Sequence, residues 1–207
     1  MSLLQTAGTV LFIGDSITDA GRDRDDPRDL GGGYPRVVAQ TYAEDGADGE
    51  VTFLNRGISG NRVRDLRARW QADCLDLKPD LVSVMIGVND TWRRYDRGDP
   101  TSAEDFERGY RAILQATVDS SSAALVLVEP FLLPVLPGQG SWREDLDPKI
   151  AVVRRIAADF STTLVPLDTV MTEAATTQPA GELAADGVHP TPAGHALIAR
   201  TWLETVR

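Results

Sequence analysis

Short apolar runs alternate with amphipathic segments along the whole chain, and this alternation most limits what the chain can fold into. The apolar, strand-like runs fall at residues 9–13, 51–54, 81–86, 124–128 and 163–167. Between them, apolar residues recur at steps of three and four, which is typical of amphipathic helices. Five strands with helices between them predict an α/β fold in three layers, α/β/α, with a five-stranded parallel sheet.

Capping signals predict where several of these helices begin. Thr101 and Glu104 match a capping box. An N-cap followed by proline at the first helical position is expected at Pro148 and again at Pro192. The apolar stripe of the helix expected over residues 63–77 includes Cys74, which we therefore expect to be buried.

Length and composition limit the classes of protein to consider. The 207 residues suit a single domain, 1–207, with a substantial core, since 42% of the residues are hydrophobic. No apolar run is long enough to span a membrane, and the first residues do not resemble a secretory signal. A net charge of −10 disfavours nucleic acid or an anionic membrane as the partner. The one cysteine fits a reducing compartment, so we expect a cytoplasmic protein without disulfides.

The two histidines are the first place to look for catalysis, because serine needs an adjacent base to act as a nucleophile. His189 lies on an expected loop, three residues after Asp186, and this spacing lets the carboxylate fold back onto the imidazole. His195 lies inside the last expected helix and has no such partner nearby, so a packing or capping role is expected for it. The pair spacing alone is a weak signal, because surface loops often carry both residue types.

Ser16 is the candidate nucleophile. It follows the first strand in the segment Gly14-Asp15-Ser16, where a sharp turn can present a hydroxyl above the edge of the sheet. A serine at this place can equally be the N-cap of the following helix. A phosphate-binding turn is disfavoured, because the segment lacks the glycine-rich cradle and the lysine of a P-loop.

Two further strand ends offer donors that could stabilise an oxyanion. Gly60 follows the second strand and could present its backbone N–H, and Asn89 follows the third strand with a side-chain amide. Each position also has an ordinary explanation, as a turn glycine or an Asx turn. All these candidates follow strands, which is where doubly wound sheets bind their ligands.

Four sequence blocks together resemble those of the SGNH hydrolases, also called GDSL-type esterases. In chain order the blocks are 14–17 (GDSI), 57–61 (GISGN), 87–90 (GVND) and 186–190 (DGVHP). Position 17 holds isoleucine where the family name has leucine. The resemblance implies a flavodoxin-like SGNH hydrolase fold, without a metal or organic cofactor.

The same resemblance implies a role for each candidate residue. Ser16 would be the nucleophile, His189 the base and Asp186 the residue that orients the base. The oxyanion hole would comprise the N–H groups of Ser16 and Gly60 and the amide of Asn89.

The segments 12–22, 55–70 and 85–96 look more specifically like a bacterial subgroup that contains intracellular acetylxylan esterases, which form homo-oligomers. The subgroup implies an acetylated sugar as the small-molecule substrate. Asp15, Trp92 and Trp142 are then candidate substrate-binding residues, although the tryptophans could equally serve in packing. Ala185 stands where the subgroup carries an aromatic residue just before the catalytic aspartate, so the substrate preference could differ.

Three other functions compete with this interpretation. An esterase with the same mechanism could act on a lysophospholipid or an acyl thioester. A metal-dependent phosphatase could use Asp15, Asp19 and Asp90, but the spacing of the first two does not match the D-x-D pattern of such sites. A non-catalytic binding module on this fold would not need serine, histidine and aspartate together.

Overall fold

The structure is a computed structural model, and it describes residues 3–46 and 51–207. Its centre is a five-stranded sheet in which all neighbouring strands pair in parallel, in the order β2-β1-β3-β4-β5. The strands are β1 (Thr9–Gly14), β2 (Thr52–Gly57), β3 (Leu81–Met85), β4 (Ala124–Val128) and β5 (Thr163–Val165). This confirms the predicted sheet, and the strand order is that of flavodoxin-like folds.

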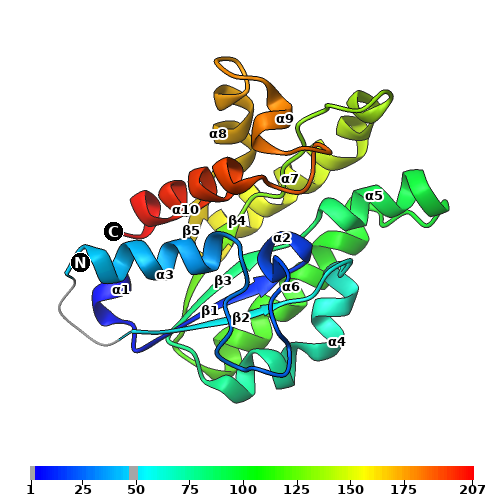
Figure 1. Cartoon of the computed structure of the whole chain (residues 1–207). Helices are drawn as coiled ribbons and strands as arrows, with labels where there is room; N and C mark the ends of the chain where they lie inside the picture. The colour runs from blue at the N-terminus through cyan, green and yellow to red at the C-terminus, as the bar shows by residue number, and fades with distance from the viewer. Residues whose placement is uncertain (1–2, 47–50) are drawn as a thin grey trace.

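Helices cover both faces of the sheet and complete the predicted three layers (Figure 1). One face carries α3 (Tyr34–Glu44) and α10 (Pro192–Val206), which lie side by side. The other face carries α4 (Val63–Asp73), α6 (Ala103–Ser120) and α7 (Arg143–Asp159). The shorter helical segments are α1 (Leu3–Thr6), α2 (Ser16–Asp19), α5 (Val88–Arg97), α8 (Leu167–Ala174), α9 (Ala180–Leu183) and the 3-10 turns Leu75–Leu77 and Gln139–Trp142.

Successive side chains of the central strands point to opposite faces, so the chain builds two apolar clusters. In β1, Val10 and Phe12 pack toward α3 and α10, whereas Leu11 and Ile13 pack toward α4 and α6. All four side chains are fully buried. A strand buried on both faces must be apolar throughout, which explains the continuous apolar runs in the sequence.

Two predicted helix starts need correction. The N-cap of α6 is Ser102, whose hydroxyl accepts from the Asp105 N–H at 3.1 Å, and the predicted capping box of Thr101 and Glu104 does not form. Helix α7 begins at Arg143, about one turn before the predicted start, so Pro148 lies inside the helix. Pro148 has no N–H, so the helix lacks the one hydrogen bond that this position would otherwise donate to the carbonyl four residues earlier.

Other sequence signals are confirmed. Thr191 caps α10 by accepting from the Gly194 N–H at 3.2 Å, with Pro192 as the first helical residue. Cys74 is fully buried at the end of α4, and burial raises the pKa of its thiol to about 12. Among the described residues, no helix is both long and apolar enough to cross a membrane.

The strand order reverses between β1 and β3, and the segments after these two strands lie on either side of that reversal. Ser16 follows β1 and Asn89 follows β3, while Gly60 follows the neighbouring strand β2. The fold therefore brings the predicted site residues to one edge of the sheet, where ligands of doubly wound sheets bind.

Candidate active site

Ser16 is free of the capping role that its sequence position left open. Asp15 is the N-cap of α2, and its carboxylate accepts from the Ile17 N–H at 3.0 Å, so Ser16 becomes the first helical residue. Gly14 permits this turn, because a Cβ at that position would lie 2.2 Å from the Met85 carbonyl oxygen. The Ser16 hydroxyl is thus left available for another partner.

That partner is His189, which reaches Ser16 from the far end of the sequence. The Ser16 Oγ and the His189 Nε2 are 3.0 Å apart, and the other ring nitrogen, Nδ1, lies 2.6 Å from Asp186 Oδ2. The second carboxylate oxygen of Asp186 accepts from the backbone N–H groups of His189, at 2.7 Å, and Val188, at 3.0 Å. A carboxylate on Nδ1 selects the tautomer whose Nε2 can accept the proton of the hydroxyl.

The electrostatics of Asp186 suit this arrangement. Burial alone would raise the pKa of the carboxyl, but hydrogen bonds from the His189 ring and from two backbone N–H groups hold that pKa below its usual value. Asp186 therefore remains a carboxylate beside the ring at neutral pH. The His189 side chain is 46% exposed, so substrate can approach the pair from solvent.

The turn that carries Asp186 and His189 is anchored by a residue that the sequence did not single out. Gln139 is 3% exposed, and its side-chain amide donates to the Asp186 carbonyl at 2.7 Å. Gly187, at φ +84°, allows this contact, because a Cβ there would lie 2.3 Å from the Leu133 carbonyl oxygen and 2.8 Å from Gln139 Oε1. The sequence carried no signal for this contact, because Gln139 and Asp186 lie 47 positions apart.

The two predicted oxyanion donors lie on neighbouring segments that touch. The Asn89 side chain is 2% exposed, donates from Nδ2 to the Asn61 carbonyl at 3.2 Å and accepts at Oδ1 from Arg93 at 3.1 Å. Gly60 is exposed at φ +81°, and no atom lies within 4 Å of where its Cβ would be. Both groups are thus placed at the same edge of the sheet as Ser16.

Aromatic side chains extend from His189 across the neighbouring surface. The Trp92 ring lies 5.7 Å from the His189 ring and 5.6 Å from the Trp142 ring, measured between centroids. Tyr95, which the sequence analysis missed, stacks on Trp142 at 5.2 Å and 12°. All three aromatic residues are half-buried, so part of each remains exposed to solvent.

Asp15 does not have the position expected of a substrate contact. Its side chain is 1% exposed and is used to cap α2. Burial raises the pKa of its carboxyl to about 7, against the opposing effect of the Ile17 N–H bond. Because the carboxyl group is buried, it caps α2 and does not lie at the surface where a substrate would bind.

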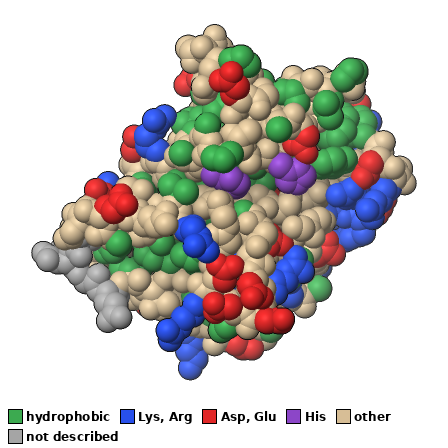
Figure 2. All heavy atoms as spheres, in the orientation of Figure 1, with side chains coloured by type: hydrophobic (Ala, Val, Ile, Leu, Met, Phe, Trp, Pro, Cys, Tyr) green, Lys and Arg blue, Asp and Glu red, His purple; other side chains and the backbone are tan. Residues whose placement is uncertain are grey.

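His195 has the capping role predicted for it, but on a different helix. Its Nδ1 accepts from the Tyr34 N–H at 3.1 Å, at the start of α3, where the N-cap Gly33 has no side chain to do so. Burial, together with the nearby His189, lowers the pKa of His195 to about 4. Figure 2 shows the two histidines on one face, with hydrophobic side chains on one side and a mixed group of acidic and basic side chains on the other.

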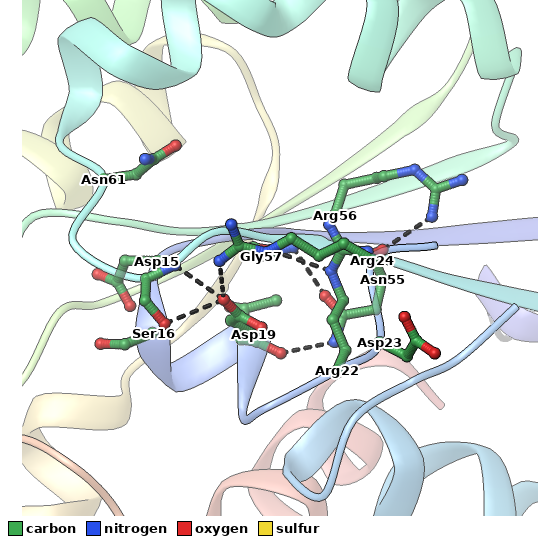
Figure 3. Close-up of polar contacts among 12 residues, drawn as sticks. Asp15, Ser16, Asp19, Arg22, Asp23, Arg24, Asn55, Arg56, Gly57 and Asn61 are labelled. Carbon is green, nitrogen blue, oxygen red and sulfur yellow. Dashed lines mark hydrogen bonds and ion pairs between the residues drawn. The ribbon is translucent and has the colours of Figure 1, made fainter. Parts of the chain in front are cut away.

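Charged and polar side chains form a network beside the Ser16 turn (Figure 3). Asp19, at the end of α2, has a 3% exposed side chain that pairs with Arg24 at 2.6 Å. Asn55, which is fully buried, donates to the Thr18 carbonyl at 2.6 Å. Helix α2 also packs so closely on Gly57 that a Cβ there would lie 2.2 Å from the Asp19 nitrogen.

Comparisons with known proteins agree with this geometry. The GDSL-like lipase/acylhydrolase family matches residues 12–197. An acetylxylan esterase from Geobacillus stearothermophilus is 37% identical over 208 aligned positions, which cover 95% of this chain and 93% of that protein.

Solved structures give the same result. A GDSL-like lipase from Parabacteroides merdae superposes with a TM-score of 0.92 at 37% identity, covering 96% of this chain and 94% of that one. The crystal structure of the Geobacillus stearothermophilus acetylxylan esterase Axe2 superposes with a TM-score of 0.88 at 35% identity and the same coverage. Solved forms of Axe2 include catalytic mutants in which a serine, an aspartate or a histidine is replaced by alanine. The chain belongs to the GDSL-like lipase/acylhydrolase family and is a carboxylic ester hydrolase.

Proposed function

We propose that this protein removes acetyl groups from acetylated xylo-oligosaccharides or related sugars by a serine acyl-transfer mechanism. The observation that carries the proposal is the continuous line of contacts from Ser16 Oγ through both ring nitrogens of His189 to Asp186, at 3.0 and 2.6 Å. The similarity to an acetylxylan esterase over 95% of the chain supports the substrate class. The catalytic mutants of that relative involve the same three residue types.

The geometry suits a two-step reaction. His189 Nε2 takes the Ser16 proton as the hydroxyl oxygen attacks the ester carbonyl, and Asp186 stabilises the imidazolium that forms. The tetrahedral oxyanion faces the N–H groups of Ser16 and Gly60 and the Asn89 amide. His189 then protonates the departing sugar alcohol, and a water molecule, activated by the same ring, releases acetate from Ser16.

Substrate binding is the finer part of the proposal. Trp92, Trp142 and Tyr95 form a row of half-buried aromatic residues beside His189, against which sugar rings can stack. Ala185 is exposed next to Asp186 and presents only a methyl group there. We assign this row of aromatic residues to binding of the alcohol part of the ester. We further propose that the protein is a single-domain, cytoplasmic homo-oligomer that needs no metal or organic cofactor.

The first experiment measures hydrolysis of p-nitrophenyl acetate and of acetylated xylobiose by the wild-type protein and by Ser16→Ala. We expect Ser16→Ala to lose about 10⁴-fold or more in kcat on both esters, and a fluorophosphonate to label only the wild type. Activity that depends on added metal and survives the Ser16 change would sink the mechanism.

A substrate panel separates the proposed function from its main alternative. Acetylated xylo-oligosaccharides are compared with lysophospholipids and acyl thioesters at equal concentration. A kcat/KM that is highest for the acetylated sugars supports the proposal. A preference for long acyl chains would instead indicate a lysophospholipase or thioesterase with the same catalytic residues.

A further inference from the structure

Gly60 lies in an open part of the loop that follows β2. The residue is exposed and has a positive φ, and the space around its Cβ position is empty. An oxyanion donor stabilises a transition state only if it is fixed before the charge develops. The residues on either side of Gly60 must therefore fix its N–H relative to Ser16.

The residue before Gly60 is held by α2, the short helix that begins with Ser16. The Ser59 N–H and hydroxyl both donate to Asp19 Oδ2, at 2.9 and 3.0 Å. Arg24 donates to the same oxygen at 2.6 Å and balances its charge. Figure 3 shows the Asp19 carboxylate where these hydrogen bonds meet. One four-residue helix therefore carries both the nucleophile and an anchor for the loop.

The residue after Gly60 is held by Arg69 of α4. Arg69 Nε donates to the Asn61 side-chain oxygen at 2.8 Å, and a terminal nitrogen donates to the Gly14 carbonyl at 3.1 Å. The other terminal nitrogen donates to the Arg56 carbonyl at 2.8 Å and pairs with Asp73 at 2.7 Å. The side chain is 15% exposed, so these contacts are largely shielded from water.

These contacts converge on the same short stretch of backbone. Gly14, which Arg69 holds, lies two residues before Ser16, and its carbonyl also accepts from the Ile58 N–H at 3.1 Å. Asn61, on the other side, is the residue whose carbonyl accepts from the Asn89 amide. The Ser16 turn, the Gly60 loop and Asn89 are therefore linked through a single set of hydrogen bonds.

Building on the proposed function, we infer that Asp19 and Arg69 are positioning residues that clamp the Gly60 loop from both sides and fix its N–H against Ser16 Oγ. Asp19 is 3% exposed and the Arg69 side chain 15% exposed, so both contact mainly the surrounding protein. Both residues act on the transition state through Gly60. We therefore expect their substitution to lower kcat and to leave KM nearly unchanged.

The test uses full-length variants and p-nitrophenyl acetate, whose hydrolysis does not depend on the identity of the natural sugar. Arg69→Lys keeps the positive charge near Asp73, but one ammonium group cannot replace the planar guanidinium that donates to four acceptors. We expect kcat to fall about 10- to 100-fold with KM within about threefold of the wild type. A boronic acid that forms a tetrahedral adduct with Ser16 should lose affinity by a similar factor. Arg67→Lys, at an exposed position on the same helix, is the matched control and should leave both constants unchanged.

A second pair of variants guards against failure of Arg69→Lys to fold. Asn61→Ala removes the side-chain acceptor of Arg69 at a half-buried position. Ser59→Ala removes one of the two donors to Asp19 at an exposed position and leaves the Ser59 N–H in place, so it should lower kcat less than Asn61→Ala. Asn61→Ala should lower kcat, and its combination with Arg69→Lys should cost little more than the larger single loss, because both changes break the same contact. Asp19→Asn should lower kcat in the same way as Arg69→Lys.

Three outcomes would overturn the clamp: wild-type kcat in Asn61→Ala and Asp19→Asn, a loss confined to KM, or fully additive losses in the double variant. Ser16→Ala, measured alongside, separates this failure from failure of the proposed function. If Ser16→Ala is inactive while the clamp variants remain fully active, only the clamp is wrong.

Discussion

At the scale of single residues, the Asn89 amide is oriented before any substrate arrives. Arg93 donates to its oxygen at 3.1 Å, which turns the amide nitrogen toward the Gly60 loop, where it donates to the Asn61 carbonyl at 3.2 Å. The amide is 2% exposed, so this orientation is stabilised in a largely water-free setting. An amide held in this way can bind a developing negative charge without reorganising.

We therefore predict that Asn89→Ala lowers kcat by about 10²- to 10³-fold while KM changes little, because the lost contact forms only in the transition state. Steady-state kinetics on p-nitrophenyl acetate measure both constants. Thermal unfolding of the same variant checks that the fold persists. A raised KM at unchanged kcat would assign Asn89 to ground-state binding instead.

Several site residues could be predicted from the sequence because of their positions just after strand ends. Ser16, Gly60 and Asn89 each follow a parallel strand, so the topology alone brings them together. The anchors Gln139 and Arg69 could not be found in the same way. Each acts through contacts with residues far away in the sequence, and neither belongs to a local pattern that marks its partner.

At the scale of elements, the start of α3 depends on a side chain from α10. Gly33 leaves the first N–H groups of α3 without a side-chain cap, and His195 supplies the acceptor at Tyr34. Gly33 cannot be replaced easily, because a Cβ there would lie 2.9 Å from the His195 ring. The two helices on this face of the sheet are thus joined by a polar contact as well as by their apolar packing.

This contact predicts a pH dependence of stability. Burial lowers the pKa of His195 to about 4, from a usual value of 6.5. Between these values the unfolded chain takes up a proton at this position and the folded chain does not, so stability declines as pH falls from 6.5 toward 4. The expected contribution is about 1–3 kcal/mol.

Denaturant unfolding at pH 7.0 and at pH 4.5, values chosen to bracket most of this window, measures the effect. His195→Asn keeps an acceptor for the Tyr34 N–H but does not titrate, so it should lose less stability than the wild type between the two pH values. Equal losses in the two proteins would show that other groups dominate the acid response.

The boundaries of elements were harder to predict than their existence. The strands and the helices α3, α4, α6 and α10 follow from apolar periodicity. Helix α5 was missed, because its sequence is mostly polar and only its first residues, Val88 to Thr91, are buried. Helix α7 begins before Pro148, because the 3-10 turn Gln139–Trp142 leads directly into it, and the pair of Arg143 with Asp147 at 2.6 Å then stabilises its first turns. That pairing depends on the helix already being formed, so a local capping rule could not reveal it.

At the scale of the whole molecule, Gly187 joins the loop after β4 to the turn before α10. Its carbonyl accepts from the Leu133 N–H at 2.9 Å, and the space for a side chain is already filled by Leu133 and Gln139. We predict that Gly187→Ala destabilises the fold by about 1–3 kcal/mol, since both its positive φ and the close contact oppose a side chain.

Urea unfolding measures this loss. Gly181→Ala is the matched control, because Gly181 lies in α9 with open space around its Cβ position. That change should be neutral or slightly stabilising, as alanine favours a helix. Should Gly187→Ala prove as stable as Gly181→Ala, the close approach at Gly187 would not be required by the fold.

The aromatic row beside His189 defines a direction on the molecular surface along which the alcohol part of an ester can lie. We predict that Trp142→Ala lowers kcat/KM about tenfold for acetylated xylotriose but less than about twofold for p-nitrophenyl acetate, whose alcohol is too short to reach the far end of the row. Trp142→Phe should recover most of the loss. Equal losses on both esters would point to disturbed packing around Trp92 instead.

Ser16 and His189 meet across 173 positions of the chain. Until the turn at 186–189 docks beside β1, the serine is an ordinary alcohol with no greater reactivity than any other on the surface. A covalent serine-directed label therefore counts the molecules in which these two distant segments have come together. Sampled during renaturation, the labelled fraction would trace when native long-range order appears, without any spectroscopic probe.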